Sequence, residues 1–221
     1  MTKRIPVVEK ILSVNDRLAL ENQARFDSAG VLALNFMASP GAGKTALIEQ
    51  TVKGLQGQVR IGMINGDIAT SLDADRAQAA GATAIQINTG GDCHLDAVMV
   101  QSALAQLDLT ALDLVIIENV GNLVCPAEFK LGTHRSVLVA SLPEGDDKPY
   151  KYPGMYRGVD VVVINKIDLL PYVPFRMDFF KKGIEVLNPG VTQFELSCRT
   201  GEGIPAWLAW LEKQVREFKE S

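Results

Sequence analysis

Residues 38–45 read A-S-P-G-A-G-K-T, and this stretch decides the fold. An apolar run, residues 31–37, precedes it, and a segment with the pattern of a helix, residues 46–55, follows it. A strand, a tight loop and a helix in this order form a phosphate-binding loop, in which backbone N–H groups and the positive end of the helix dipole face phosphate oxygens. The sequence therefore predicts a nucleoside triphosphate site formed by Ser39, Pro40, Gly41, Ala42, Gly43, Lys44, Thr45 and Ala46.

Four residues of this loop have separate expected tasks. Gly41 and Gly43 allow the backbone to approach the ligand closely. Lys44 reaches the β- and γ-phosphates as a point charge, and the Thr45 hydroxyl binds Mg²⁺. Ala38 stands where the phosphate-loop pattern has its first glycine, which predicts a slightly constrained loop that still binds. The alternative is a chance glycine-rich turn, but further nucleotide motifs follow in the expected order.

The composition is ordinary for a soluble globular protein. Of 221 residues, 47% are hydrophobic and 22% are charged, and the net charge is −4. This charge provides no basic surface, so nucleic acid is not an expected partner. No stretch reaches the length of a membrane span, and the start M-T-K-R-I-P lacks the apolar region of a signal peptide. We therefore expect a cytoplasmic protein without membrane association.

Apolar runs alternate with helical patterns along the chain. The runs that predict strands are residues 31–37, 59–65, 83–87, 112–118, 136–141, 159–164 and 191–196. Helices are expected at residues 46–55, 72–80, 93–107, 175–187 and 204–218, with Asp92 as the cap of the third. This alternation predicts a doubly wound α/β domain whose mostly parallel sheet is covered on both faces and binds ligands beyond the carboxyl ends of its strands. The polar segment 143–155 is expected to be a long functional or mobile loop.

A helical stripe precedes the first strand, with apolar side chains at Val7, Ile11, Val14 and Leu18. We expect residues 1–28 to form an N-terminal amphipathic helix that packs on the domain or on a partner subunit. Residues 29–221 then form the nucleotide-binding domain.

The tetrapeptide Asn165-Lys166-Ile167-Asp168 ends a predicted strand and resembles the guanine-reading motif of P-loop GTPases. The Asp168 carboxylate can accept hydrogen bonds from guanine N1–H and the exocyclic amine, a donor pair that adenine lacks. In those proteins the asparagine braces the loop and the lysine stem lies along the base. The alternative is that Asp168 caps a helix, but the order of the motifs favours GTP.

Ser197-Cys198-Arg199 follows the last predicted strand and resembles the second base-contacting loop of GTPases, S-A-K. Cys198 and Arg199 replace the alanine and the lysine. Backbone contacts to guanine O6 would survive these changes, whereas a stacked role of the lysine need not. We expect Cys198 to be a packed thiol and not a metal ligand.

Hydrolysis of GTP requires Mg²⁺ and a positioned water molecule. Besides Lys44 and Thr45, the candidates are Asp67, Asp73 and Glu118 as Mg²⁺ ligands and Gly121 as a donor to the γ-phosphate. Glu118 and Gly121 belong to an E-x-x-G sequence where small GTPases have D-x-x-G. Solvation or helix capping remains the alternative for Asp67 and Asp73.

Cysteine and histidine residues offer a transition-metal site. Cys93 and His94 are expected to open a helix, where the pKa of a thiol is lowered, and Cys125 follows Gly121 by four residues. Two thiolates and an imidazole suit Zn²⁺ or Ni²⁺. The spacing alone is a weak signal, because free cysteines are often simply buried. His134 is expected to be a surface histidine beside Arg135.

Long strings of the chain resemble the hydrogenase nickel-incorporation GTPases, the HypB family. These strings are S-P-G-A-G-K-T, G-D-I-A-T-x-x-D-A-x-R, N-T-G-G-x-C-H-L-D, I-E-N-V-G-N-L-V-C-P, E-G-D-D-K-P-x-K-Y-P and N-K-I-D-L-L, in order between residues 36 and 203. The resemblance implies a P-loop GTPase domain of the metallochaperone and signal-recognition type, with inserted metal-binding segments, that delivers nickel to the [NiFe]-hydrogenase large subunit.

The resemblance also implies partners. Members of this family form GTP-dependent homodimers and bind metal at the interface through residues that match Cys93, His94 and Cys125. A small zinc-containing accessory protein shares nickel delivery with them. The expected ligands are therefore GTP or GDP, Mg²⁺ and Ni²⁺, with Zn²⁺ as an alternative cargo.

Three other functions remain open at this stage. The urease nickel GTPase is similar but has a Cys-Pro-His metal motif, whereas Cys93 and His94 are adjacent here. A small-molecule kinase that uses ATP is disfavoured by Asp168. A nucleotide-gated scaffold with structural zinc would hardly hydrolyse its nucleotide.

Overall fold

Seven parallel strands form one sheet at the centre of the protein. The computed structural model describes the backbone of residues 7–67 and 72–220, and the side chains of residues 12–67 and 76–220. The strands are β1 (Leu32–Ala38), β2 (Ile61–Asp67), β3 (Thr83–Asn88), β4 (Leu114–Glu118), β5 (Arg135–Ser141), β6 (Val161–Asn165) and β7 (Thr192–Glu195). Their order across the sheet is β3-β2-β4-β1-β5-β6-β7, and every neighbouring pair is parallel.

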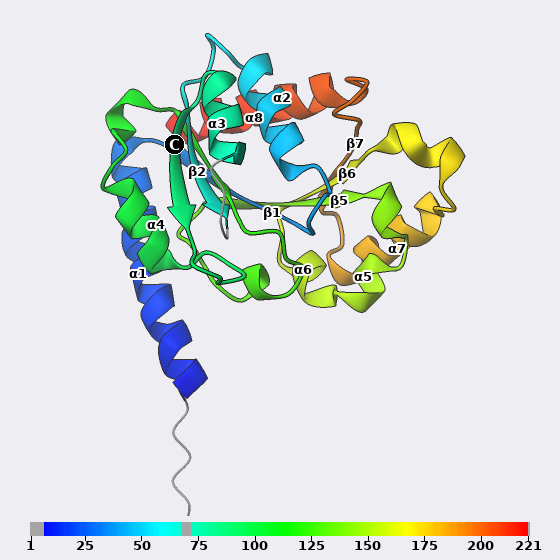
Figure 1. Cartoon of the computed structure of the whole chain (residues 1–221), viewed down its shortest axis with the longest axis horizontal. Coiled ribbons are helices and arrows are strands. Elements are labelled where there is room, and N and C mark those ends of the chain that lie inside the picture. Colours follow the sequence, from blue (N-terminus) through cyan, green and yellow to red (C-terminus); the bar gives the residue numbers. More distant parts are fainter. Residues whose placement is uncertain (1–6, 68–71, 221) are drawn as a thin grey trace, which may run out of the picture.

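Helices cover both faces of this sheet (Figure 1). The helices α2 (Lys44–Gly54), α3 (Leu72–Ala79) and α8 (Ile204–Lys219) lie on one face. The other face carries α1 (Val7–Ala29), α4 (Ala97–Leu104), α5 (Lys148–Lys151), α6 (Pro153–Arg157) and α7 (Met177–Leu187). The predicted doubly wound α/β fold is confirmed. Among the residues described, no helix has both the length and the apolar character needed to cross a bilayer.

The alternation of side chains along β1 divides the core into layers. Leu34 and Phe36 point into the layer beneath α2 and α8, where Phe36 meets the fully buried Trp207 edge to face. Ala33 and Met37 point to the opposite face. Because successive side chains of a strand face opposite ways, a strand covered on both sides must be apolar throughout, as residues 31–37 are apart from Asn35.

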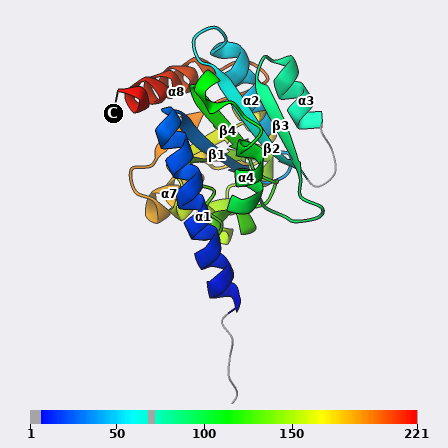
Figure 2. The same cartoon turned by 90° about the vertical axis from the view of Figure 1, so that its left-hand side faces the viewer.

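Helix α1 lies along α4 at the edge of one face, and Figure 2 shows that its first turns extend past the body of the domain. Buried amides hold it there. Asn22 Nδ2 donates to the carbonyl of Ala97 at 2.9 Å and to that of Leu131 at 3.2 Å, and Asn15 Oδ1 accepts from the N–H of Ala97 at 2.8 Å. Helix α1 therefore packs on the domain of its own chain. The division of the chain into two parts at residue 28 stays a prediction.

Two expectations about local structure are wrong. Helix α4 begins at Ala97 and not at Cys93, because Asp96, not Asp92, accepts the hydrogen bond of a cap, from Met99 N at 2.8 Å. The polar segment 143–155 is not an open loop. It folds into the 3₁₀ turn η3 (Leu142–Glu144) and the helices α5 and α6, since Glu144 closes a capping box with Ser141.

Candidate nucleotide and metal site

The phosphate-loop residues line a cavity of about 440 Å³ at the carboxyl ends of β1, β2 and β4. Helix α2 begins at Lys44, so its N-terminal N–H groups face this cavity. Gly41 and Gly43 have φ values of 78° and 99°, a left-handed backbone that favours glycine. The loop thus has the geometry that a chain of N–H groups needs to surround a phosphate.

Glu118 is one of the charged residues that line this cavity, and its side chain is only 1% exposed. Its Oε1 accepts from the Thr45 hydroxyl at 2.6 Å and lies 3.0 Å from Lys44 Nζ. Among the described residues, no donor reaches its buried Oε2. A buried carboxylate oxygen without a partner is costly, and beside a threonine hydroxyl it is a suitable environment for Mg²⁺, which prefers oxygen ligands.

Two further predicted residues lie at the same cavity. Asp67, at the end of β2, lines its wall together with Gly121. Gly121 lies against Pro40, since a Cβ at residue 121 would be 3.2 Å from the Pro40 backbone. Asp73 belongs to α3, but its side chain lies outside the described residues.

The Asn165-Lys166-Ile167-Asp168 segment is tied to the phosphate loop. Asn165 Nδ2 donates to the carbonyl of Ala42 at 2.9 Å, and Lys166 Nζ donates to the carbonyl of Gly41 at 2.6 Å. Asn165 Oδ1 also accepts from the N–H of Cys198 at 3.2 Å. One asparagine side chain therefore joins the phosphate loop to both predicted base-contacting loops.

The second base loop closes on Asp168. The Ser197 hydroxyl donates to Asp168 Oδ1 at 2.6 Å and accepts from the N–H groups of Arg199 and Thr200 at 3.2 and 3.1 Å. Cys198 packs against the core beneath α2, and burial raises the pKa of its thiol to about 11. A packed, protonated thiol is consistent with the expectation that Cys198 is no metal ligand.

The three predicted transition-metal ligands meet within one chain. The ligand atoms of Cys93, His94 and Cys125 lie within 4.8 Å of one another. The two sulfur atoms are 2.9 Å apart, and Cys93 Sγ is 3.7 Å from His94 Nδ1. The His94 ring stacks on Phe129, with centroids 3.9 Å apart, which fixes its orientation. Two sulfurs and an imidazole at this separation fit a Ni²⁺ or Zn²⁺ ion.

The expected reason for thiolate character at this cluster is wrong. Cys93 lies in the loop before α4, four residues ahead of the first helical residue, so it does not stand at a helix N-terminus. Cys125 opens the 3₁₀ turn η2 (Cys125–Ala127), and its pKa is raised, first by the hydrogen bond with Cys93 and then by burial. A bound metal ion must therefore displace protons from this pair.

Sequence reasoning missed two residues that organise the site. Glu144 accepts a short hydrogen bond from the Ser39 hydroxyl and so ties η3 to the phosphate loop. Asn119, fully buried, accepts from the N–H of Leu95 at 3.0 Å, next to His94 in the chain. Both occur in the family-like strings E-G-D-D-K-P and I-E-N-V-G-N, which was the only signal for them.

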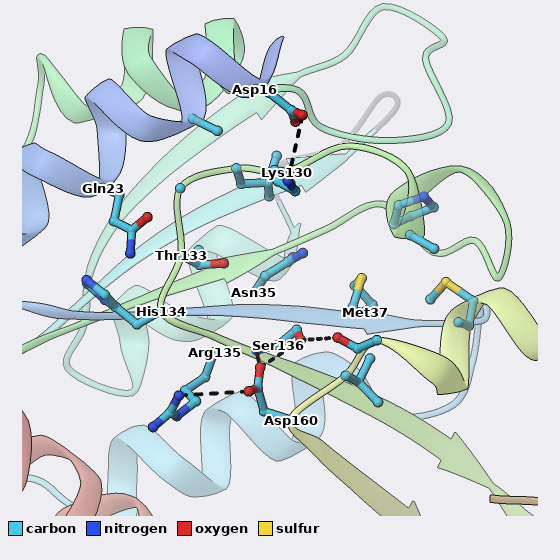
Figure 3. A pocket seen from close by; sticks show the side chains of 18 of the residues that line it. Asp16, Gln23, Asn35, Met37, Lys130, Thr133, His134, Arg135, Ser136 and Asp160 are labelled. Atoms are coloured by element: carbon cyan, nitrogen blue, oxygen red, sulfur yellow. Dashed lines mark hydrogen bonds and ion pairs between the residues drawn. The ribbon is translucent and has the colours of Figure 1, made fainter. Parts of the chain in front are cut away.

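A second cavity, of about 430 Å³, lies between α1, β5 and α6 and contains none of the predicted site residues (Figure 3). Ion pairs border it, Lys130 with Asp16 at 3.7 Å and Arg135 with Asp160 at 3.8 Å. His134 in its wall is not a surface histidine. Its side chain is 9% exposed, and its nitrogen atoms bond to the Ala33 N–H and the Asp27 carboxylate at 2.9 and 2.8 Å.

Known proteins are similar to this chain in sequence. The profile of the "CobW/HypB/UreG, nucleotide-binding domain" family matches residues 33–195. The hydrogenase maturation factor HypB of Rhizobium leguminosarum bv. viciae is 50% identical over 211 residues, which cover 95% of this chain and 71% of that protein.

Solved structures agree with the sequence comparison. The crystal structure of HypB from Helicobacter pylori in complex with nickel has a TM-score of 0.88 at 38% identity, over 92% of this chain and 95% of that one. The GDP complex of the signal recognition particle 54 kDa protein from Aeropyrum pernix K1 has a TM-score of 0.57 at 13% identity, over 86% and 50% of the two chains, so it supports the fold alone. The chain therefore belongs to the CobW/HypB/UreG family of nucleotide-binding proteins and, within it, to the HypB hydrogenase maturation factors.

Proposed function

We propose that this protein is a GTP-hydrolysing nickel metallochaperone that inserts nickel into a [NiFe]-hydrogenase during its maturation. One observation carries the proposal. The Cys93, His94 and Cys125 ligand atoms lie within 4.8 Å of one another, and Cys125 follows by four residues the Gly121 that lies on the phosphate loop. A metal cluster on the segment that meets the nucleotide is the arrangement a nucleotide-controlled metal carrier requires.

GTP is the proposed nucleotide. The phosphate-loop N–H groups and Lys44 bind the phosphates, and Asp168 accepts hydrogen bonds from guanine. Mg²⁺ would be held by Thr45, Asp67 and Glu118, with Asp73 as a further candidate, and would neutralise charge that develops on the γ-phosphate. Gly121 donates its N–H to the γ-phosphate. The unpartnered Glu118 Oε2 supports the Mg²⁺ site.

Nickel is the proposed cargo. The nickel complex of the Helicobacter pylori relative supports this assignment. One chain supplies three ligand atoms, so a fourth comes from water or from a second copy, and we propose a GTP-dependent homodimer with the metal at its interface. A maturation accessory protein would supply the nickel, and the hydrogenase large-subunit precursor would receive it in the cytoplasm.

Nucleotide turnover tests the first half of the proposal. We expect Mg²⁺-dependent hydrolysis of GTP by the wild type, little hydrolysis of ATP, and loss of turnover in Lys44→Ala. Asp168→Asn should lose preference for GTP by at least about tenfold while the protein stays folded, since an amide cannot accept two guanine hydrogen bonds. Equal turnover of ATP and GTP by the wild type would contradict the guanine assignment.

Metal titration tests the second half. Nickel should bind the wild type and fail to bind Cys93→Ala, whereas Cys198→Ala should bind like the wild type. The oligomeric state, measured by light scattering with GDP and with a non-hydrolysable GTP analogue, should shift to dimer with nickel and the analogue. Zinc that survives chelation and nucleotide exchange, together with negligible turnover, would instead support a scaffold with structural zinc.

A further inference from the structure

Residues 89–95, which contain two of the metal ligands, are attached at both ends to strands of the nucleotide site. At one end the N–H of Thr89 donates to the carbonyl of Asp67 at 3.0 Å. At the other end Leu95 is fully buried, and its side chain lies over Gly66, where a Cβ would be 2.6 Å from it. Cys93 and His94 are thus held by the ends of β2 and β4.

The side chain of Asn119, the residue directly after β4, attaches this loop to the end of that strand. Its Oδ1 accepts from the N–H of Leu95 at 3.0 Å and from the N–H of Val120 at 3.0 Å. Its Nδ2 donates to Asn35 Oδ1 at 3.3 Å, and its own N–H continues the ladder to the carbonyl of Phe36 at 3.0 Å. Asn119 is 0% exposed, so these bonds form away from water, where an unsatisfied amide is costly. Its bonds to Asn35 and Phe36 therefore hold Asn119 in place against β1.

The remaining ligand is attached differently. Cys125 belongs to the segment that leaves the sheet after Asn119, passes Gly121 against Pro40 and reaches η2. A nucleotide that draws Gly121 toward its γ-phosphate therefore acts on the segment that carries Cys125. The pair Cys93 and His94 stays with β2 and β4, because Asn119 and Leu95 hold it there.

We propose that Asn119 is the positioning residue that converts the nucleotide state into a change in nickel affinity. This inference rests on the proposed function. By anchoring Cys93 and His94 while Cys125 follows the nucleotide-sensing segment, Asn119 makes the distances among the three ligands depend on the nucleotide. Without its amide, the loop of residues 89–95 loses its hydrogen bond to Asn119, so Cys93 and His94 can shift together with Cys125 and the distances among the ligands differ less between the two states.

The test compares nickel dissociation constants measured by competition with a chelating dye, with GDP and with a non-hydrolysable GTP analogue. For the wild type we expect the two constants to differ by at least about fivefold. In Asn119→Ala the ratio should fall to within about twofold of one, while GTP-analogue binding and nickel binding persist. By linkage, nickel should change the affinity for the analogue relative to that for GDP by the same factor in the wild type, and by no more than about twofold in the variant.

Asn22→Ala is the matched control. Asn22 is also 0% exposed and bonds α1 to Ala97 and Leu131, but in the described part of the chain it makes no hydrogen bond to residues 89–95 and does not line the nucleotide cavity. It should lower thermal stability and leave the nickel ratio of the wild type intact. Where Asn119→Ala does not fold, Asn35→Ala serves instead, because it removes the acceptor of Asn119 Nδ2. In this variant the ratio of the two nickel dissociation constants should be smaller than in the wild type but still differ from one.

The outcomes separate the two proposals. If folded Asn119→Ala and Asn35→Ala keep the wild-type ratio of nickel dissociation constants, the proposed role of Asn119 is wrong. It is also wrong if Asn22→Ala lowers this ratio as much as Asn119→Ala does. Identical nickel affinities in both nucleotide states of the wild type overturn it as well. A wild type that binds neither GTP nor nickel overturns the proposed function itself.

Discussion

The side-chain amide of Asn165 donates to the carbonyl of Ala42 at 2.9 Å, across 123 positions of the chain. The amide thereby occupies the space beside Gly43, where a Cβ would lie 2.3 Å from Asn165 Nδ2. The base-reading and phosphate-reading loops are thus in contact at a point where the chain has no room for a side chain.

Replacing Gly43 by alanine should therefore break the nucleotide site. The left-handed backbone at this position, with φ of 99°, costs an alanine about 1–2 kcal/mol, and the displaced Asn165 loses a bond worth about 1 kcal/mol. We expect GTP affinity, measured by fluorescence titration, to fall at least tenfold. Gly154→Ala lies in helix α6, where the added Cβ meets no atom of another segment within 4 Å, and should leave GTP affinity unchanged without lowering stability. Wild-type affinity in Gly43→Ala would refute this account of the loop.

Glu118→Gln probes the buried carboxylate beneath the phosphates. Glutamine keeps the shape of Glu118 but not the charge that faces Lys44 and Thr45. We expect Mg²⁺-dependent GTP turnover to fall by roughly 10–100-fold, with a higher Mg²⁺ requirement, as for residues that support metal sites. The exposed Glu212→Gln on α8 is the control and should hydrolyse GTP normally. Unchanged Mg²⁺ dependence would remove Glu118 from the magnesium site.

The free energy of unfolding should fall at acid pH, because protonation of Asp113 removes a stabilising ion pair. The guanidinium of Arg60 bonds to this carboxylate, which is 6% exposed, and holds its pKa well below the ordinary value, with help from Lys219. A carboxyl whose pKa is depressed in the folded state stabilises it above the unfolded pKa of about 4, and this stabilisation is lost as the pH falls below that value.

The comparison with Asp113→Asn isolates this contribution. At pH 7 the variant should lose about 1.5–3 kcal/mol of unfolding free energy, the range for hydrogen bonds to charged groups. Urea unfolding between pH 6 and 3 should show that the difference in unfolding free energy between the wild type and the variant becomes smaller as the pH falls. Asp178→Asn, at an exposed position, should show no such narrowing. A gap that stays constant with pH would exclude the Arg60 pair as the cause.

Nickel affinity should rise with pH. The pKa of Cys125 is raised by its hydrogen bond with Cys93, so at neutral pH the metal competes with protons for the thiol pair. Calorimetric titration between pH 6.5 and 8.5 should show nickel binding that tightens as the pH rises, with release of protons on binding at the lower end of this range. Cys125→Ser should lose most of the affinity and Cys198→Ser none, because Cys198 is packed beneath α2. Nickel affinity that is independent of pH would mean that this pair is not the ligand set.

The sequence could determine the fold because its signals are local. The apolar runs and the A-S-P-G-A-G-K-T loop identify parallel strands and the edge at which ligands bind, since periodicity and turn chemistry depend on neighbouring residues. The start of α4 shows the limit of such reasoning. Asp92 and Asp96 are equally suitable caps in sequence, and Asp96 is selected where Asn15 of α1 accepts from the first helical N–H, that of Ala97.

The tertiary structure alone decided how the sites are joined. Contacts between remote segments, such as that of the Asn119 side chain with the N–H of Leu95, leave no periodic signal, because a buried asparagine pairs with whichever backbone group the packing brings to it. The same holds for Asn165 with Ala42, Glu144 with Ser39, and the two sulfurs of Cys93 and Cys125 at 2.9 Å. The chain determined which chemical groups are present, and the packing of the sheet ends determined which of them meet.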